Sequence, residues 1–403
     1  MALLNKKVLI VGNGYLGSTI VVQFAKDKTV AWEITVLTPH DFQEVPFRMT
    51  KALAAGATEH DKTIYPLQRE PGVTYLIDAC LSLRRGVCVT AKNGELSFDF
   101  AVVATGVNMG VFVPGTNENT IESRRAIVQG MHAKILSANS IVIGGAGPVG
   151  VEAAADIKLR HKTKTVTLIN PSGKVLEMMP KTLADKAAGA LAKMGIKHLA
   201  DSATADEPTN GKLALKSGKE LDCDLYIVAY AKGPNSSFMD PACKTPEGYI
   251  KVNQKCEVAG LEGSVWAVGD VSSLTRVKGA AIGKDQTTLV PANISCAAKG
   301  RDQAVWVPSF PMGVVTGPLL VALGHEVEGA FGVGPNLPGC FCSWFCWCCC
   351  CAGGPCHAPA GAGVAKMKAD WNNTVFPSVG FGMGDGNKDK KADRPFSSQE
   401  MTR

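Results

Sequence analysis

The sequence has little that would suit a nucleic-acid-binding or secreted protein. It contains no polybasic run and no basic patch interleaved with aromatic residues, and its formal net charge is only +6 over 403 residues, so we expect no nucleic-acid binding. The stretch MALLNKKVLIVG leads almost directly into an expected β-strand, and Met1-Ala2 lacks the glycine that N-myristoylation requires. We therefore expect an intracellular protein without a secretory signal.

Cysteine is sparse over most of the chain and crowded near its end. Of the 14 cysteines, eight lie between Cys340 and Cys356. The other six are Cys80, Cys88, Cys223, Cys243, Cys256 and Cys296. The scattered six are typical of reduced, buried, small hydrophobic residues in an intracellular protein.

Length and composition predict a globular protein with two or three domains. Hydrophobic residues make up 46% of the chain and charged residues 19%, which is enough for sizeable cores.

A glycine-rich turn opens the chain. An apolar β run at residues 6–12 leads into Gly12-Asn-Gly14-Tyr-Leu-Gly17, then a helical pattern, then a second β run that ends at Thr38. The first glycine permits the tight turn, the second lets the backbone approach a pyrophosphate, and the third lets helix and strand pack closely. This βαβ context predicts a dinucleotide site.

The same unit recurs later in the chain. The strand NSIVIGG leads into Gly145-Ala-Gly147-Pro-Val-Gly150 and a helical pattern, and the next strand, TVTLIN, ends at Asn170. Either turn alone could be a chance glycine-rich connection. Two turns, each in a full βαβ unit, favour two dinucleotide sites over that alternative.

Further motifs follow in a fixed order. They are Asp99 with Ala104-Thr105-Gly106, Glu152 after the second turn, Pro234-Asn235, and Val268-Gly269-Asp270. Over roughly residues 6–300 the set resembles the two-dinucleotide flavoproteins of the pyridine nucleotide-disulfide oxidoreductase fold. Within that family the chain is most similar to the apoptosis-inducing-factor-like group, which includes ferroptosis suppressor protein, and next to the type II NADH dehydrogenases.

The resemblance implies an α/β fold with two Rossmann-type domains. The FAD domain would span 1–115 and 241–300, interrupted by an inserted NAD(P)H domain at 116–240. A C-terminal region, 301–380, would follow, with a disordered tail at 381–403.

The resemblance also assigns roles to residues. Gly12, Gly14 and Gly17 would hold the FAD pyrophosphate, and Gly145, Gly147 and Gly150 that of NAD(P)H. Thr105 and Gly106 would lie near the adenosine, Asp270 would accept a hydrogen bond from a ribityl hydroxyl, and Glu152 would position cofactors or handle protons near the nicotinamide and flavin. Two alternatives stay open: Asp270 as a helix N-cap, and Glu152 as a first-turn carboxylate favoured by the helix dipole.

The acid that usually binds the ribose 2′-hydroxyl about 20 residues after such glycines is missing from both units. Thr38 and Asn170 stand in its place. An acid would repel a 2′-phosphate and Asn170 would not, so with Lys174 and Lys162 nearby we expect NADPH to be accepted as well as NADH. In the alternative, Asn170 bonds the ribose and the lysines form a solvated face.

A redox-active cysteine pair is also missing. Residues 40–56 after the second strand hold no cysteine, and Cys223 stands alone between 116 and 240. Electrons are therefore expected to leave the flavin directly for a quinone-type acceptor. A reductase of an iron–sulfur protein or of monodehydroascorbate, or a non-catalytic flavoprotein scaffold, stays open, because Tyr230-Ala231 departs from the family and Pro291 should kink or shorten its helix.

The crowded cysteines belong to CFCSWFCWCCCC, residues 340–351, within a charge-free stretch. Prolines bracket a run too short to span a membrane. Aromatic residues and clustered cysteines favour an interfacial segment with S-palmitoylation at Cys346, Cys348, Cys349, Cys350 and Cys351. A metal site, disfavoured by the spacing, and an inert tail are the alternatives. We thus expect peripheral contact with the cytoplasmic face of a membrane and no metal, and a homodimer is left open.

Overall fold

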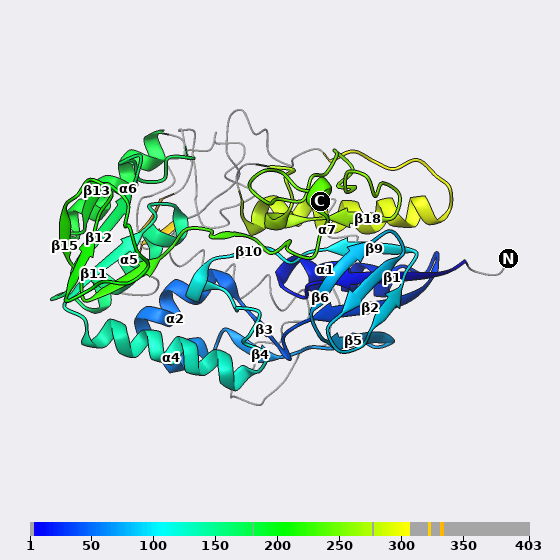
Figure 1. The fold of residues 1–403 in the computed structure, drawn as a ribbon, viewed down its shortest axis with the longest axis horizontal. Coiled ribbons are helices and arrows are strands. Elements are labelled where there is room, and N and C mark those ends of the chain that lie inside the picture. The colour runs from blue at the N-terminus through cyan, green and yellow to red at the C-terminus, as the bar shows by residue number, and fades with distance from the viewer. Residues whose placement is uncertain (1–3, 180, 276–277, 307–320, 324–330, 334–403) are drawn as a thin grey trace, which may run out of the picture.

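The structure, a computed structural model, describes residues 4–179, 181–275, 278–306, 321–323 and 331–333. Two parallel sheets lie at opposite ends of the molecule, with helices packed against them (Figure 1). The α/β architecture with two Rossmann-type units is thus confirmed.

The first sheet has the strand order β18-β9-β1-β2-β5. Its strands are β1 (Asn5–Val11), β2 (Ala31–Thr38), β5 (Val73–Ile77), β9 (Phe100–Val103) and β18 (Val265–Ala267). Helices α1 (Tyr15–Lys26) and α7 (Ala280–Ala298) pack together on one face, over a core that includes Ile10, Phe24 and Trp266. Residues 8–11 of β1 and 100–103 of β9 are buried throughout, and burial on both faces explains why these central segments are continuous apolar runs.

The second sheet has the strand order β13-β12-β11-β16. Its strands are β11 (Ser140–Gly144), β12 (Thr165–Asn170), β13 (Lys197–Ala200) and β16 (Leu225–Val228), and its helices are α5 (Pro148–Arg160) and α6 (Lys181–Lys193). In α5 the run Ala153-Ala154-Ala155 is buried, so small side chains bring this helix close to its neighbours.

Smaller elements complete the fold. The shorter strands are β3 (Phe42–Glu44), β4 (Ile64–Pro66), β6 (Cys80–Arg84), β7 (Val87–Thr90), β8 (Glu95–Ser97), β10 (Val107–Asn108), β14 (Lys212–Ala214), β15 (Glu220–Asp222), β17 (Gly233–Pro234), β19 (Val321–Leu323) and β20 (Phe331–Val333). The remaining helices are η1 (Pro46–Arg48), α2 (Met49–Ala55), α3 (Ala57–His60), η2 (Gly110–Phe112), α4 (Ile121–Ser137), η3 (Pro241–Cys243) and η4 (Gly269–Val271).

The chain passes between the two sheets twice, and the two passages are joined. Strand β10 on the way out pairs antiparallel with β17 on the way back. Helix α2 adds a second junction, because Met49 and Leu53 share a core with Val151 of α5. The domain boundaries drawn from the sequence stay a prediction, and this shared core shows that α2 packs against the second sheet's helix.

Helix α7 starts later than the N-cap alternative for Asp270 requires, and Pro291 does not shorten it. Helix α7 begins at Ala280, ten residues after Asp270, instead of directly after it, and it continues through Pro291 to Ala298. The missing N–H of Pro291 therefore does not shorten the helix, which is held by burial of Val290 and Ile294 in the first core.

No helix among the described residues is long and apolar enough to cross a membrane. The cysteine-rich segment, and with it the lipidation prediction for Cys346, Cys348, Cys349, Cys350 and Cys351, lies outside the described residues, as does the tail at 381–403.

Candidate functional site

The first glycine turn is closed by backbone contacts. Gly12 has a φ of +98°, and its N–H donates to Leu37 O at 2.8 Å. A Cβ on Gly17 would lie 2.0 Å from Gly12 O, so no side chain fits there. Gly14, in contrast, is exposed, and a Cβ built on it would meet no atom within 4 Å.

The second turn repeats this geometry. Gly145 has a φ of +109° and donates to Ile169 O at 2.8 Å. A Cβ on Gly150 would lie 1.9 Å from Gly145 O, whereas one on Gly147 would meet nothing within 4 Å. The sequence prediction that the three glycines do different jobs thus has a steric counterpart in both turns.

Each turn ends at a helix whose first N–H groups are left open. Gly14 is the N-cap of α1 and Gly147 that of α5, and neither helix has a side-chain cap. Uncapped N–H groups and the positive end of the helix dipole favour an anion. Both turns therefore fit a pyrophosphate.

Asn13 is a candidate ligand contact that the sequence pattern does not single out. Its side chain is 7% exposed, and neither Oδ1 nor Nδ2 has a hydrogen-bond partner among the described residues. A buried amide normally has partners, so an open one between Gly12 and Gly14 fits a polar ligand held by this turn. The variable position of the glycine motif gave no reason to single it out.

Asp270 lies beside the same turn. A Cβ on its neighbour Gly269 would come within 2.4 Å of Leu16 Cδ1, which places η4 against the first turn of α1. The Asp270 carboxylate accepts a hydrogen bond from Gly279 N at 2.8 Å, ahead of α7. It does not cap a helix that follows it directly, so that alternative is wrong.

Burial raises the pKa of Asp270 above its ordinary value, although Gly279 N–H and Lys278 act the other way. Further donors, such as hydroxyl groups of a ligand, would stabilise the charged form. Gln286 fixes the turn, because its Oε1 accepts from Gly269 N at 2.7 Å. Gln286 is 1% exposed, and this contact makes it a positioning residue for the turn.

Thr105 and Gly106 close the junction between the sheets. Thr105 Oγ1 donates to Asn235 O at 2.7 Å, Asn235 Nδ2 donates to Thr105 O at 2.9 Å, and Asn235 N donates to Gly106 O at 3.0 Å. These residues are 130 positions apart, so their pairing could not be read from spacing. The structure brings Thr105 beside the Gly12 turn, and its contact with a cofactor stays a prediction.

Glu152 lies in the second turn of α5 and is 5% exposed. The first-turn alternative is therefore wrong, and its predicted role in positioning or proton handling stays untested.

Asn170 ends β12 at the carboxyl edge of the second sheet. Its Oδ1 lies 2.6 Å from His198 Nε2, and its Nδ2 donates to Ser172 Oγ and Lys174 O. The amide is thus already held by the protein. The side chain of Lys174 is exposed and pairs loosely with Glu177 at 3.6 Å.

Lys162 does not lie near Asn170, and that expectation is wrong. It follows the C-terminus of α5 and precedes β12, whereas Asn170 ends β12. A six-residue strand separates the two, or roughly 17 Å at 3.3 Å per residue.

The segment after β2 lies against the first turn. The rings of Tyr15 and Phe47 meet edge to face at 5.6 Å. Residues 40–56 of this segment contain no cysteine. Lys51 in α2 forms an ion pair with Glu59 in α3 at 2.8 Å. Burial alone would raise the pKa of Glu59, but hydrogen bonds from Lys51 and Lys62 lower it to about 2.

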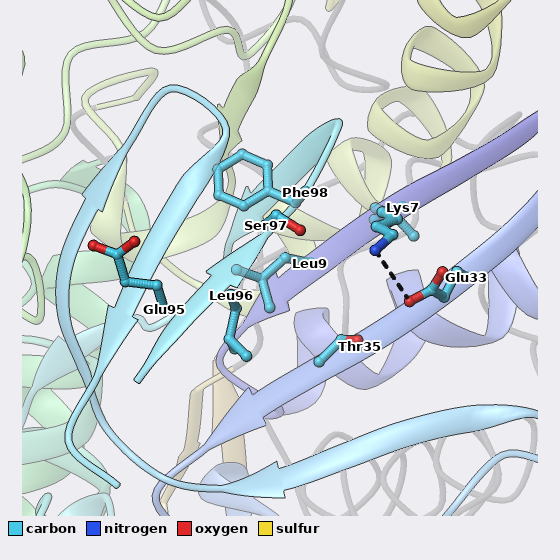
Figure 2. A pocket seen from close by; sticks show the side chains of 9 residues that line it. Lys7, Leu9, Glu33, Thr35, Glu95, Leu96, Ser97 and Phe98 are labelled. Carbon is cyan, nitrogen blue, oxygen red and sulfur yellow. Dashed lines mark ion pairs between the residues drawn. The ribbon is translucent and has the colours of Figure 1, made fainter. Parts of the chain in front are cut away.

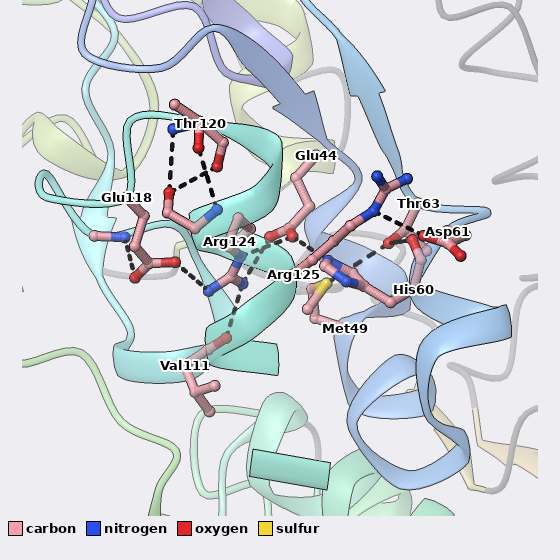
Figure 3. A network of polar contacts seen from close by, with 12 residues as sticks. Glu44, Met49, His60, Asp61, Thr63, Val111, Glu118, Thr120, Arg124 and Arg125 are labelled. Carbon is pink, nitrogen blue, oxygen red and sulfur yellow. Dashed lines mark hydrogen bonds and ion pairs between the residues drawn. The ribbon is translucent and has the colours of Figure 1, made fainter. Parts of the chain in front are cut away.

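A buried ionic network centred on Arg124 holds α4 to the residues that follow β10 (Figure 3). Arg124 of α4 is fully buried, and its guanidinium binds Glu44 at 2.8 and 2.7 Å, Glu118 at 2.9 Å and Val111 O at 2.9 Å. His60 Nε2 lies 2.8 Å from Glu44 Oε1. Burial raises the pKa of Glu44, but hydrogen bonds from His60 and Arg124 outweigh it, and the carboxyl pKa lies below its ordinary value. The network therefore joins β3, α3 and η2 to α4.

A hollow on the first sheet is separate from the turns. Figure 2 shows Lys7 and Glu33, paired at 3.8 Å, with Leu9, Thr35 and residues 95–98 around it. Lys7 and Glu33 lie in the first halves of their strands, whereas the glycine turn follows the carboxyl end of β1. The hollow is therefore not part of the dinucleotide site.

Comparison with known proteins agrees with this geometry. The family model described as "Pyridine nucleotide-disulphide oxidoreductase" matches residues 6–298. The chain belongs to the pyridine nucleotide-disulphide oxidoreductase family. The resemblance drawn from the glycine motifs is thus confirmed.

Two curated relatives illustrate the similarity. Oxidoreductase ptaL of Pestalotiopsis fici is 26% identical over 289 residues, which cover 66% of this chain and 77% of that protein. Ferroptosis suppressor protein 1 of Homo sapiens is 28% identical over 237 residues, which cover 55% of this chain and 62% of that protein.

Solved structures show the same fold. The sulfide:quinone oxidoreductase of Aquifex aeolicus superposes with a TM-score of 0.69 at 14% identity, covering 93% of this chain and 91% of that one. Putidaredoxin reductase, in its covalent complex with putidaredoxin, gives a TM-score of 0.60 at 17% identity, covering 83% and 82%.

FAD and NAD(P)H are the cofactors of this family, as the two glycine motifs predicted. The two turns fit them: each offers an open second glycine and an uncapped helix start, and the first also offers the unpaired amide of Asn13. The protein is a flavin-dependent pyridine nucleotide oxidoreductase.

The open second glycines allow a matched test. Gly14 and Gly147 have φ values of −72° and −77°, which alanine adopts freely. We expect Gly14→Ala to fold but lose most of its flavin, because a methyl group would occupy the backbone's approach to the pyrophosphate. Gly147→Ala should keep its flavin and show a KM for NAD(P)H raised about tenfold or more, equal to ~1.4 kcal/mol or more.

Flavin absorbance per protein, circular dichroism and steady-state kinetics measure these effects. Gly17→Ala is the steric contrast and should fail to fold, because its Cβ would strike Gly12 O. A Gly14→Ala protein with a full complement of flavin would contradict the assignment of the first turn to FAD.

Proposed function

We propose that the protein passes two electrons from NADH or NADPH through bound FAD to a quinone-type acceptor. When bound, these cofactors supply the redox chemistry, as hydride transfer from nicotinamide to flavin. The observation that carries the proposal is the pair of tight glycine turns, one at each sheet, in a chain whose residues 40–56, after the second strand, contain no cysteine.

The division of labour follows the two sheets. In the proposed arrangement FAD occupies the split domain of residues 1–115 and 241–300, and NAD(P)H the inserted domain of residues 116–240. Gly14 and the first N–H groups of helix α1 would bind the FAD pyrophosphate, and Asp270 would accept a hydrogen bond from a ribityl hydroxyl. Gly147 and the start of α5 would bind the nicotinamide dinucleotide.

Direct transfer to a small acceptor is supported by the placement of the cysteines. Among the described residues, none of the six thiols belongs to the segment of residues 46–55, which packs by the first turn. Disulfide reductases need two thiols at the flavin, and this segment offers Arg48 and Lys51 instead. No side chain is required as a nucleophile in the proposed reaction.

The acceptor is tested by steady-state assay of the purified full chain. Ubiquinone-type quinones, monodehydroascorbate and a small iron–sulfur protein are compared under NADH and NADPH, with ferricyanide as a general acceptor. We expect the highest kcat/KM with a quinone. A faster reaction with the iron–sulfur protein or with monodehydroascorbate would favour that alternative. Flavin that stays oxidised under anaerobic NADH or NADPH, with no acceptor present, would favour a non-catalytic scaffold.

Loose discrimination between NADH and NADPH is proposed for the second turn. The carboxylate usual at the end of the second strand is replaced by Asn170, whose amide is held by His198 and Ser172. The end of β12 therefore presents no negative charge of its own to a 2′-phosphate, and the exposed ammonium of Lys174 lies in the same turn.

Asn170→Asp should therefore shift the coenzyme preference. The new carboxylate would repel a 2′-phosphate, so kcat/KM for NADPH should fall about tenfold relative to NADH, equal to ~1.4 kcal/mol. Lys162→Asp, at the other end of β12, is the control for charge alone and should leave the ratio unchanged. An unchanged ratio in Asn170→Asp would place the 2′-phosphate elsewhere.

We also propose that the segment of residues 340–356 brings the protein to the cytoplasmic face of a membrane. Clustered aromatic residues and cysteines support an interfacial, lipidated segment. A variant with serine at Cys346, Cys348, Cys349, Cys350 and Cys351 should lose membrane association on cell fractionation. Membrane association equal to that of the parent would contradict the proposal.

A further inference from the structure

Two of the scattered cysteines are in contact in the hairpin of β6 and β7, which shares a buried core with the first sheet. Cys80 begins β6, and Cys88 lies in the antiparallel neighbour β7, where it pairs with Leu83. The two Sγ atoms are 3.4 Å apart. Cys88 is fully buried, and Cys80 is partly exposed.

The sequence predicts reduced, buried, small hydrophobic residues at the six scattered cysteines and gives no sign of this contact between two of them. Buried thiols do occur alone here: Cys223 and Cys256 are both 0% exposed, and burial raises the pKa of each, to about 11 and about 12. Cys88 differs, because the hydrogen bond from Cys80 lowers its pKa against the effects of burial and Asp78. The thiolate of Cys88 therefore forms more readily than that of Cys223 or Cys256, whereas the hydrogen bond with Cys88 and burial raise the pKa of Cys80.

We propose that Cys80 and Cys88 are a redox-active dithiol that closes reversibly into a disulfide in response to a hydroperoxide. One sulfur, as the thiolate, attacks the peroxide oxygen, becomes a sulfenic acid and releases hydroxide, or from an organic hydroperoxide an alkoxide that takes a proton from water. The other sulfur then displaces the sulfenic hydroxyl as water and forms the S–S bond. Two thiols are oxidised, one peroxide is reduced, and a small dithiol reverses the change by exchange.

The local backbone favours closure. The sulfurs must approach from 3.4 Å to about 2.05 Å. The register shifts between Cys80 and Ser82, so Cys80 sits at an irregularity of the ladder and can move with little loss of backbone hydrogen bonding. Partial exposure of Cys80 gives a small oxidant a route to the pair.

The pair is tied to the carboxyl edge of the first sheet. Asp78, two residues before Cys80, donates its N–H to Thr38 O at 2.9 Å. The Asp78 carboxylate accepts bonds from Ala79 N, Lys92 N and Asn93 N, which fix both strands of the hairpin to that edge. The redox state of the pair thus has a structural path to the edge that carries the first glycine turn.

The sequence makes the disulfide easy to detect. Trypsin cleaves after Arg69, Arg84, Arg85 and Lys92, so Cys80 and Cys88 fall in separate peptides, 70–84 and 86–92. The folded full chain is treated with hydrogen peroxide, alkylated, digested without reductant and examined by mass spectrometry. We expect the cross-linked pair 70–84/86–92 at least tenfold above the untreated sample, and its loss after dithiothreitol.

The isolated thiols serve as internal controls. Cys223 and Cys256 should stay alkylated at the same dose, and Cys80→Ser and Cys88→Ser should abolish the cross-link. A second sample oxidised in denaturant should lose the preference for this pairing. Peptides 70–84 and 86–92 that stay reduced, or that carry only sulfinic or sulfonic acid without a cross-link, would overturn the proposal.

Discussion

Both halves of the fold depend on the same steric constraint: where each helix begins, there is no room for a side chain between the helix and the turn before it. Gly17 and Gly150 press against the carbonyl oxygens of Gly12 and Gly145 at distances that exclude any Cβ. This contact draws α1 and α5 close to their strands and aims their first N–H groups into the open space beside Gly14 and Gly147. Packing and anion binding are thus two results of one geometry.

Electron transfer between two bound dinucleotides requires that the two glycine turns keep a fixed position relative to each other. Buried polar contacts between the two sheets hold them there. Thr105 and Asn235 bond each other across the two passages between the sheets. Arg124, Glu44 and Glu118 then brace α4 and the residues that follow β10. Removing one partner of such a buried ion pair leaves an uncompensated charge and typically costs about 3–5 kcal/mol. The network therefore makes the junction a specific structure instead of a loose linker.

The parts of this account that the sequence predicts are those encoded locally. Both glycine turns and their βαβ units follow from spacing and apolar runs over some 30 residues, as does the lack of a thiol after β2. Long-range pairings could not be predicted, because nothing in the sequence around Glu44 indicates Arg124, 80 residues away, as its partner. The contact between Cys80 and Cys88 is local, but it depends on the register of their hairpin, which the sequence pattern does not specify. The N-cap alternative for Asp270 is wrong because Gly269 and Asp270 form a separate turn held by Gln286. Lys162 was expected near Asn170 because the two are close in sequence, but the length of β12 separates them.

The central claim is that two dinucleotides bind in one chain and exchange electrons directly. Anaerobic mixing of the purified, full-length holoprotein with stoichiometric NADH or NADPH tests it most directly, with the flavin absorbance followed over time. The account predicts a yellow protein whose flavin band bleaches with either nucleotide and recovers on adding a quinone. A protein that purifies without flavin, or whose flavin band persists with both nucleotides, would contradict it.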